Sequence, residues 1–241
     1  MKALILAGGR GKRLDALSMN KNKCMVNIAG KPVIQFSLDC AASTTVDEII
    51  IVVGYRAEEI INYYGNNYKD KRIKYVIQYE QKGLVHAIEC SRDTIGKDDF
   101  MLLLGDEILI NPRHQAMINE YNKTKKNIFA LCGVLLVKDR KMIKRTYTLI
   151  QNEENQIFRL VEKPRNPLNK FMGTGDCIFN TKIFDYIPYT PIHHERQEKE
   201  LPDLIQCAID DGRLVKSFVI CDHYVNINSK SDITLTERMN I

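Results

Sequence analysis

A glycine-rich turn with three basic residues follows the first apolar stretch of the chain. After Leu6 and Ala7, its sequence is Gly8-Gly9-Arg10-Gly11-Lys12-Arg13. Glycines let the backbone approach an anion closely, and successive N–H groups can hold phosphate oxygens. The basic side chains add positive charge, so we predict that the turn binds phosphate. The alternative is an ordinary turn that binds no ligand and whose basic side chains face the solvent.

Two familiar nucleotide-binding patterns do not fit this turn. A P-loop requires Ser or Thr after its lysine, and here Arg13 follows Lys12. A dinucleotide-binding fingerprint requires a third glycine at the position of Leu14. The turn therefore argues against a P-loop NTPase and against a generic Rossmann oxidoreductase.

Asp106 is a second residue whose type and position could support chemistry. It follows the apolar run 101–104 and Gly105. In α/β sheets, ligands bind at the carboxyl ends of the strands. A carboxylate there can hold Mg²⁺, which takes few protein ligands and many phosphate oxygens. We therefore predict a magnesium site at Asp106, and an aspartate that only caps a turn is the alternative.

Predicted strands and helices, which must position these residues, alternate along the first half of the chain. Apolar runs predict four strands, at 3–7, 49–53, 73–78 and 101–104. Helical patterns lie between them, at 32–42, 57–64 and 84–91. This alternation indicates βαβ units and a mainly parallel sheet, hence an α/β fold.

The second half has more strands and fewer helices. Its predicted strands are 129–137, 147–151, 157–162, 177–179 and 214–221. One helix is predicted at 201–211. Because no linker separates the halves, we expect a single domain, 1–241, with a nucleotide-binding half (about 1–125) and a substrate-binding half (about 126–241).

Composition excludes several classes of protein. The formal net charge is only +5 and the charges are interspersed, which gives no support for nucleic-acid binding. No apolar run approaches the ~20 residues that span a bilayer, so no membrane segment is expected. The seven cysteines include no CxxC pair, which is typical of reduced thiols in a cytoplasmic protein.

Several motifs in order resemble those of the nucleotide-sugar pyrophosphorylases, or sugar-phosphate nucleotidyltransferases. The glycine-rich turn resembles the signature loop of that family. The further motifs that resemble it are Lys23, Lys31-Pro32, Gln78-x-x-x-x-Gly83-Leu84-x-His86-Ala87, Gly105-Asp106, Glu162-Lys163-Pro164 and Gly175-x-Cys177-x-Phe179. The resemblance covers nearly the whole chain and implies a Rossmann-like three-layer fold with a mainly parallel mixed sheet.

The resemblance also implies a reaction and the residues that perform it. A phosphate oxygen of the acceptor attacks the α-phosphorus of a nucleoside triphosphate and expels pyrophosphate, with Mg²⁺ as cofactor. The catalytic residues would be Arg13, Lys23 and Asp106. The residues that bind the nucleotide would be Leu6, Ala7, Gly8, Gly9, Gly11, Gln78 and Gly83.

The acceptor expected from the resemblance is a sugar 1-phosphate. The residues that would bind it are Tyr147, Glu162, Lys163 and Gly175. A glutamine amide at Gln78 both donates and accepts, which suits the imide edge of uracil or thymine, so UTP or dTTP is favoured and CTP stays open. The assembly is also left open, with a homodimer as one form.

Three positions depart from the family pattern. Asn226 stands where a second metal-binding aspartate is usual, so the metal residues would be Asp106 and Asn226, with Asp222 as the alternative to Asn226. Thr148 replaces a common glycine and Cys177 a common tyrosine, which puts the acceptor in question. The alternatives are a cytidylyltransferase for a non-sugar phosphorylated acceptor and a catalytically weak regulatory homologue that binds nucleotide.

Overall fold

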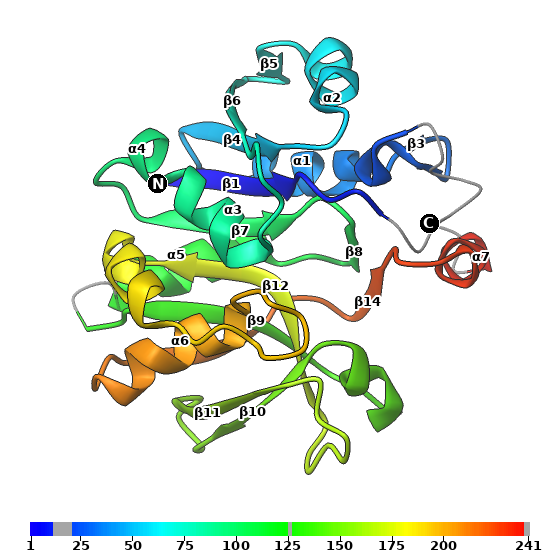
Figure 1. Cartoon of the computed structure of the whole chain (residues 1–241). Coiled ribbons are helices and arrows are strands. Elements are labelled where there is room, and N and C mark those ends of the chain that lie inside the picture. Colours follow the sequence, from blue (N-terminus) through cyan, green and yellow to red (C-terminus); the bar gives the residue numbers. More distant parts are fainter. Residues whose placement is uncertain (12–20, 125–126, 239–241) are drawn as a thin grey trace.

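The computed structural model describes residues 1–11, 21–124 and 127–238 (Figure 1). Its centre is a group of four parallel strands in the order β6 (Lys71–Ile77), β4 (Glu48–Val53), β1 (Lys2–Ala7) and β7 (Phe100–Leu104). The strands β1 and β4 are almost entirely apolar and buried. Such continuous apolar runs are typical of parallel strands that are covered on both faces.

The second half extends the same sheet with antiparallel pairs. β12 (Phe171–Phe179) lies beside β7, and the remaining strands are β9 (Ala130–Leu136), β10 (Tyr147–Gln151), β11 (Ile157–Glu162) and β13 (Val215–Val219). With the short edge strand β5 (Asn67–Tyr68), the sheet has ten strands. The predicted α/β fold with a mixed central sheet is confirmed.

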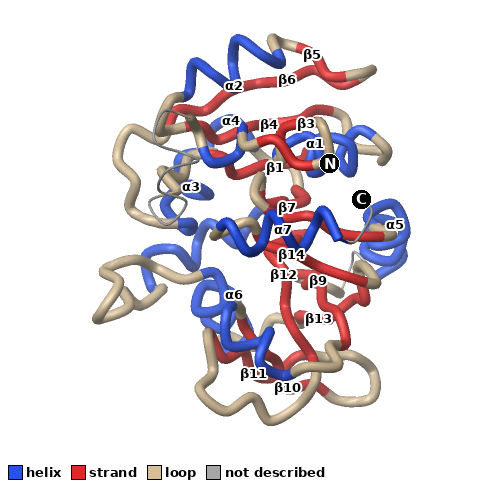
Figure 2. The backbone as a smooth tube through the Cα atoms, turned by 90° about the vertical axis from the view of Figure 1, so that its right-hand side faces the viewer, coloured by secondary structure: helices blue, strands red, loops and turns tan. Residues whose placement is uncertain are grey.

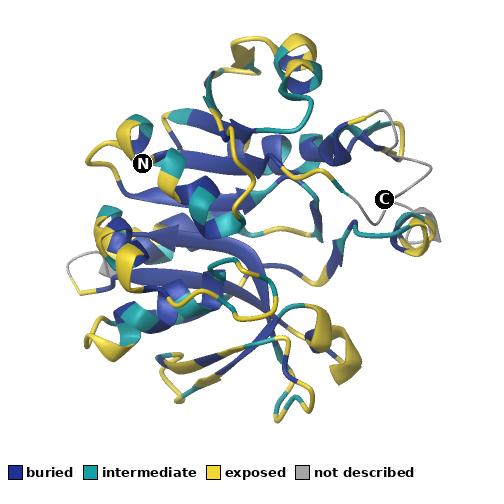
Figure 3. Ribbon diagram, viewed as in Figure 1, coloured by how far each residue is buried: buried dark blue, intermediate teal, exposed yellow. Residues whose placement is uncertain are grey.

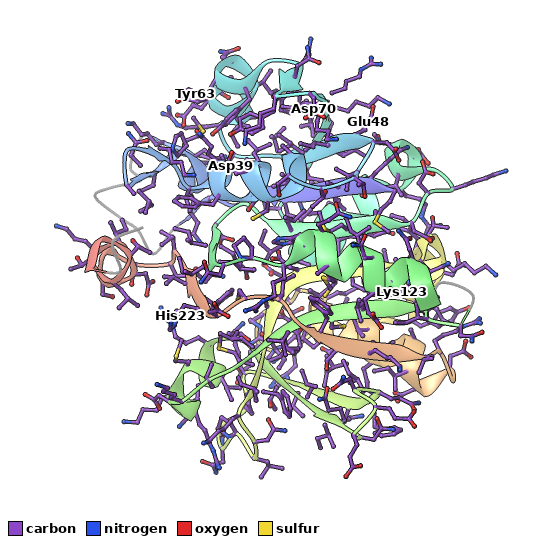
Figure 4. All side chains as sticks on the ribbon, turned by 180° about the vertical axis from the view of Figure 1, so that it is seen from behind. Asp39, Glu48, Tyr63, Asp70, Lys123 and His223 are labelled. Carbon is purple, nitrogen blue, oxygen red and sulfur yellow. The ribbon has the colours of Figure 1, made fainter. Side chains whose placement is uncertain are left out.

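Helices cover both faces of the sheet and complete three layers. One face packs against α1 (Ile34–Ala42), α2 (Ala57–Tyr64) and α5 (His114–Thr124). The other packs against α3 (Leu84–Cys90), α4 (Arg92–Ile95), η4 (Thr181–Tyr189) and α6 (Leu201–Asp210). Figure 3 shows the buried sheet between helices whose outer faces are exposed, and Figure 4 shows α5, with Lys123 near its end, across the back.

Small elements surround the carboxyl ends of the central strands. Two antiparallel pairs of strands are separate from the main sheet. One consists of β2 (Asn27–Ile28) and β3 (Lys31–Pro32), and the other of β8 (Glu107–Ile110) and β14 (His223–Asn226). The 3₁₀ helices are η2 (Lys23–Met25) and η3 (Arg140–Arg145). The last helix, α7 (Lys230–Arg238), contacts β14 and β2, and Figure 2 shows it in front of β14.

The sequence did not predict α5, β8, β14 or α7. In α5 the apolar residues Met117, Ile118 and Tyr121 are fully buried, but polar residues separate them and weaken the pattern. The strands β8 and β14 have only four residues each, too few for a clear alternation. No helix within the described ranges is long and apolar enough to cross a membrane.

Candidate active site

A cleft of about 580 Å³ opens at the carboxyl ends of β1 and β7. Its walls combine the glycine-rich turn, the end of β7 and the start of α3. The lining residues are Leu6, Gly8, Gly9, Arg10, Gly11, Lys23, Cys24, Gln78, Gln81, Gly83, Leu84, Ala87, Leu104, Asp106 and Glu198. The cleft therefore brings together most residues that the sequence assigned to the nucleotide.

Lys23 and Asp106 meet in this cleft. The Lys23 ammonium group donates to the Asp106 carboxylate and, at 2.8 Å, to Oδ1 of Asn228. Lys23 is 8% exposed, so its ammonium group is held in place by these partners instead of water. Three segments that are distant in sequence thus place one cation and one carboxylate side by side.

The position of Lys23 depends on the preceding residue, Asn22, which is fully buried. Its side chain accepts from the backbone N–H of Cys24 and donates to the carbonyl oxygens of Ala7 and Tyr55, at 2.6–3.2 Å. Asn22 thereby caps η2 and ties it to the end of β1. Ala7 takes part through this carbonyl and does not itself line the cleft.

A second cavity of about 170 Å³ adjoins the cleft and shares Leu84 and Leu104 with it. Residues from β10, β11, β12 and β14 line it. They include Thr146, Tyr147, Glu162, Lys163, Gly173, Thr174, Gly175, Glu200, Tyr224 and Asn226, with Glu107 and Arg145. All four residues that the resemblance assigned to the acceptor therefore face one cavity.

Two carboxyl groups with raised pKa values, those of Glu107 and Glu162, lie in the wall of the second cavity. Glu107 is 3% exposed, and burial together with the charges of Asp176 and Asp106 raises its pKa well above the ordinary value. Its carboxylate accepts from the Tyr224 hydroxyl at 2.6 Å and from the Gly175 N–H at 3.0 Å. Burial also raises the pKa of Glu162, against the opposing effect of Lys163 at 2.8 Å.

Of the residues predicted to hold metal, Asp106 lies in the turn just before β8, and Asn226 is the last residue of β14. Asn226 pairs with Glu107 in the β8–β14 ladder, and the Ile227 N–H donates to the Asp106 carbonyl at 2.9 Å. The Asn226 Oδ1 now accepts from the Asn228 side chain at 2.6 Å. Asp106 and Asn226 are therefore near each other, because the neighbour of each, Glu107 and Ile227, bonds to or pairs with the other residue.

Asp222 does not share this location, contrary to the alternative considered from sequence. It lies before β14, at the end of the ladder that pairs with Ile110. Its carboxylate binds Arg113 and accepts from Asn111 at 2.9 Å, and these two partners lower its pKa. At about 3.3 Å per residue along the strand, Asp222 is more than 10 Å from the Asn226 position.

Two of the departures from the family pattern, Thr148 and Cys177, do not line the second cavity. The Thr148 hydroxyl donates to Asn169 at 2.8 Å and is not in the cavity wall. Cys177 is fully buried and does not line the cavity, but its side chain lies directly against Tyr147, which does. Thr148 and Cys177 are therefore absent from the cavity wall, and of the two only Cys177 contacts a residue of that wall. Their influence on the acceptor stays a prediction.

One predicted site residue, Arg13, lies outside the described residues. Conversely, the sequence did not single out Glu107, Asn228 or Glu198, although all three contribute to the cleft or its supporting bonds. Glu107 had a signal, because it directly follows Asp106. Glu198 had none, because only the fold brings its loop against Gly83.

Comparison with known proteins agrees with this arrangement. A nucleotidyl transferase family (NTP_transferase) matches residues 2–224. The chain belongs to this family. A UTP–glucose-1-phosphate uridylyltransferase, AglF of Haloferax volcanii, is 31% identical over 233 residues, which cover 96% of this chain and 93% of the relative.

Other members of the family are longer than this chain. A glucose-1-phosphate thymidylyltransferase of Streptomyces griseus is 29% identical over 99% of this chain and 66% of its own length. The bifunctional protein GlmU of Methanocaldococcus jannaschii is 31% identical over 97% of this chain and 52% of its own length. The chain thus spans about half to two thirds of these two proteins.

Solved structures share the fold at lower identity. A UDP-glucose pyrophosphorylase complexed with UDP-glucose superposes with a TM-score of 0.87 at 20% identity, covering 99% of this chain and 97% of that one. A UTP-bound UGPase from Acinetobacter baumannii gives 0.84 at 22% identity, with 99% and 92% covered. At this identity the likeness concerns the fold alone.

Proposed function

We propose that this chain transfers a nucleoside monophosphate from a nucleoside triphosphate to a sugar 1-phosphate, giving a nucleotide sugar and pyrophosphate. The observation that carries the proposal is the pair of adjoining cavities with Lys23 and Asp106 beside them. One cavity suits a nucleotide and the other a small polar acceptor. Consecutive residues, Asp106 and Glu107, line one cavity each.

The reaction joins two anions, so charge neutralisation and alignment are its main requirements. The acceptor phosphate oxygen attacks the α-phosphorus, and the bond from that phosphorus to the pyrophosphate oxygen breaks. Lys23 is placed to attract phosphate oxygens from either substrate. Arg13 has the same role by resemblance, next to the pyrophosphate that leaves.

Asp106 and Asn226 fit a magnesium ion that takes most of its ligands from phosphate groups. They offer one carboxylate and one neutral amide oxygen, both beside the nucleotide cleft or its neighbour. Mg²⁺ commonly uses one or two carboxylates and completes its shell with water and substrate oxygens. When bound, the ion would neutralise charge on the triphosphate. The present partners of the two residues, Lys23 and Asn228, would have to rearrange.

The residues of the two cavities support the proposed substrates. Glu162 and Lys163 offer a carboxylate for sugar hydroxyls and a cation for a sugar phosphate, and Gly175, which has no side chain, lets Leu104 and Glu107 pack close to the backbone of the cavity wall. Tyr147 forms the floor, since its ring covers Gly173. Gln78 at the other end favours UTP or dTTP. We keep the assignment of 1–125 to the nucleotide and 126–241 to the acceptor, and the cytoplasm as the location, as proposals.

The experiment that tests the proposal is a matrix of five nucleoside triphosphates against a panel of sugar 1-phosphates, with pyrophosphate release as readout and Mg²⁺ present. We expect release with UTP or dTTP and at least one sugar 1-phosphate. Release only with CTP and a phosphorylated alcohol would favour the cytidylyltransferase alternative. Nucleotide binding by calorimetry without pyrophosphate from any pair would favour a regulatory homologue.

A further inference from the structure

The side-chain amide of Gln78 is held in one orientation at the base-binding end of the cleft. Gln78 follows β6 and is 4% exposed, yet it lines the cleft. Its Nε2 lies 3.1 Å from the Gly83 carbonyl oxygen and 3.0 Å from Nδ1 of His86. Both hydrogens of the amide nitrogen are thereby used.

The Gly83 carbonyl decides which end of the amide is the nitrogen. A carbonyl oxygen can only accept, so a flipped Gln78 would place two oxygens in contact. Gly83 itself is fixed, because it adopts a φ of +93° and a Cβ there would lie 2.8 Å from the Glu198 carboxylate. The amide nitrogen therefore faces Gly83 and His86, and the oxygen faces the opposite way.

The Gln78 oxygen is the atom left for a ligand. It packs against Gly8 in the cleft wall, where a Cβ on that glycine would lie 2.8 Å away. Within the described ranges, no group donates a hydrogen bond to it. A nucleobase that enters this end of the cleft therefore meets an acceptor. Uracil and thymine present a ring N–H at N3, whereas cytosine presents a lone pair there.

His86 supplies the second bond that holds this orientation. It lies on the first turns of α3, and Nδ1 must be its unprotonated nitrogen in order to accept from Gln78. The hydrogen then belongs to Nε2, which lies 3.8 Å from the Cys90 sulfur. In this tautomer, Nδ1 of His86 can only accept a hydrogen bond from Gln78. A protonated ring, or a side chain with no acceptor, would release one amide hydrogen.

We propose that His86 is a positioning residue that fixes the Gln78 amide with its oxygen towards the nucleobase and so makes the enzyme select uracil or thymine over cytosine. The proposal rests on the proposed function for the reaction. It assigns base choice to a residue that does not itself line the cleft. A site built to accept an N–H discriminates strongly, because a base that lacks it leaves a buried acceptor unpaired.

The test compares His86→Leu, which removes the acceptor, with His86→Asn, whose Oδ1 can stand where Nδ1 stood. Glu89→Leu, at an exposed position of α3, is the matched control. We measure kcat/KM for UTP, dTTP and CTP with the best acceptor. The wild-type preference for UTP or dTTP over CTP should be at least about 100-fold. It should fall at least about 10-fold in His86→Leu, mainly through KM, and return in His86→Asn.

Three results would overturn the proposal. The first is a wild-type preference for CTP. The second is an unchanged ratio of kcat/KM between UTP or dTTP and CTP in His86→Leu. The third is an equal loss of kcat/KM with all three nucleotides, which is the result that a merely structural role of His86 would give. If no pair of substrates releases pyrophosphate, the proposed function fails instead. Calorimetric affinities for UTP and CTP in the same variants then test base selection on their own.

Discussion

The ammonium group of Lys23 lies between the carboxylate of Asp106 and the side-chain oxygen of Asn228, residues 83 and 205 positions away in sequence. The pair is mostly shielded from solvent, with Lys23 and Asp106 side chains 10% and 21% exposed. Lys23 therefore neutralises Asp106 in the folded protein. In the proposed reaction, phosphate oxygens of the substrates would replace Asp106 as the partner of Lys23.

Replacing Asp106 by Asn should lower kcat at least about 100-fold, because the charge that balances Lys23 and attracts magnesium is lost. Lys23→Met should have an effect of similar size. The fold should survive in both, as judged by circular dichroism and the melting temperature. Asn119→Ala, on the far side of the sheet in α5, is a control that should leave kcat unchanged. Near-normal turnover of Asp106→Asn at saturating Mg²⁺ would contradict the role.

Asn226→Asp should make the melting temperature respond more strongly to magnesium. The new carboxylate would lie near Glu107, whose Oε1 is 3.4 Å from the Asn226 amide nitrogen. Repulsion should lower the melting temperature without metal, and Mg²⁺ should raise it more than in wild type, since charged oxygens bind the ion more tightly. The Mg²⁺ concentration for half-maximal activity should also fall.

Asp222→Asn is the matched control for this experiment, because Asp222 binds Arg113 at the far end of β14. Its Mg²⁺ titration should coincide with that of wild type. If Asp222→Asn raises the magnesium requirement while Asn226→Asp has no effect, the assignment of Asn226 is wrong.

Gly175→Ala should close part of the second cavity. A Cβ at this position would lie 2.3 Å from the Leu104 side chain and 3.1 Å from Glu107 Oε1. Such overpacking costs about 1–3 kcal/mol in stability and narrows the acceptor site. KM for the sugar 1-phosphate should rise at least about 10-fold, with a smaller change in KM for the nucleotide. Equal changes in both KM values would show that Gly175 does not belong to the acceptor site.

His114 and Asp176 form a buried pair that should make stability depend on pH. Burial alone would lower the pKa of His114, but hydrogen bonding and charge from Asp176, at 3.0 Å, raise it to about 10. The raised pKa contributes to the free energy of unfolding below the ordinary imidazole value of about 6.5, and this contribution is lost as pH rises through about 10.

The measurement is the melting temperature of wild type and His114→Gln between pH 6 and pH 10. The difference between the two proteins should be largest near pH 6 and should shrink towards pH 10. A difference that stays constant over this range would mean that His114 is not protonated in the folded protein.

The apolar pattern was enough to predict the central elements of the fold. Helix α2 and strands β10 and β11 begin and end where the sequence placed them, because each is a segment rich in apolar residues that is bounded by polar residues or glycine. The pattern failed where burial depends on a distant partner. Gly173–Gly175 extend β12 because Tyr147 packs over Gly173, a contact that the local sequence does not encode.

The site could be predicted only where its residues belong to ordered motifs. Gln78, Gly83, Glu162 and Lys163 stood in such motifs, and the structure places each of them in a cavity wall. Asn228 stayed without a role because its partner, Lys23, is 205 residues away. The orientation of the Gln78 amide was also beyond the sequence, since the Gly83 carbonyl and His86 determine it in three dimensions.

The most direct test of the central claim is the fate of the α-phosphate. The protein is incubated with Mg²⁺, a sugar 1-phosphate and UTP or dTTP labelled with ³²P at the α position. The account predicts that the label moves into a nucleotide sugar, in equal amount to the pyrophosphate released, and that omitting the sugar 1-phosphate abolishes both. Label that stays in the nucleotide, or appears as a nucleoside mono- or diphosphate, with every sugar 1-phosphate offered, would contradict it.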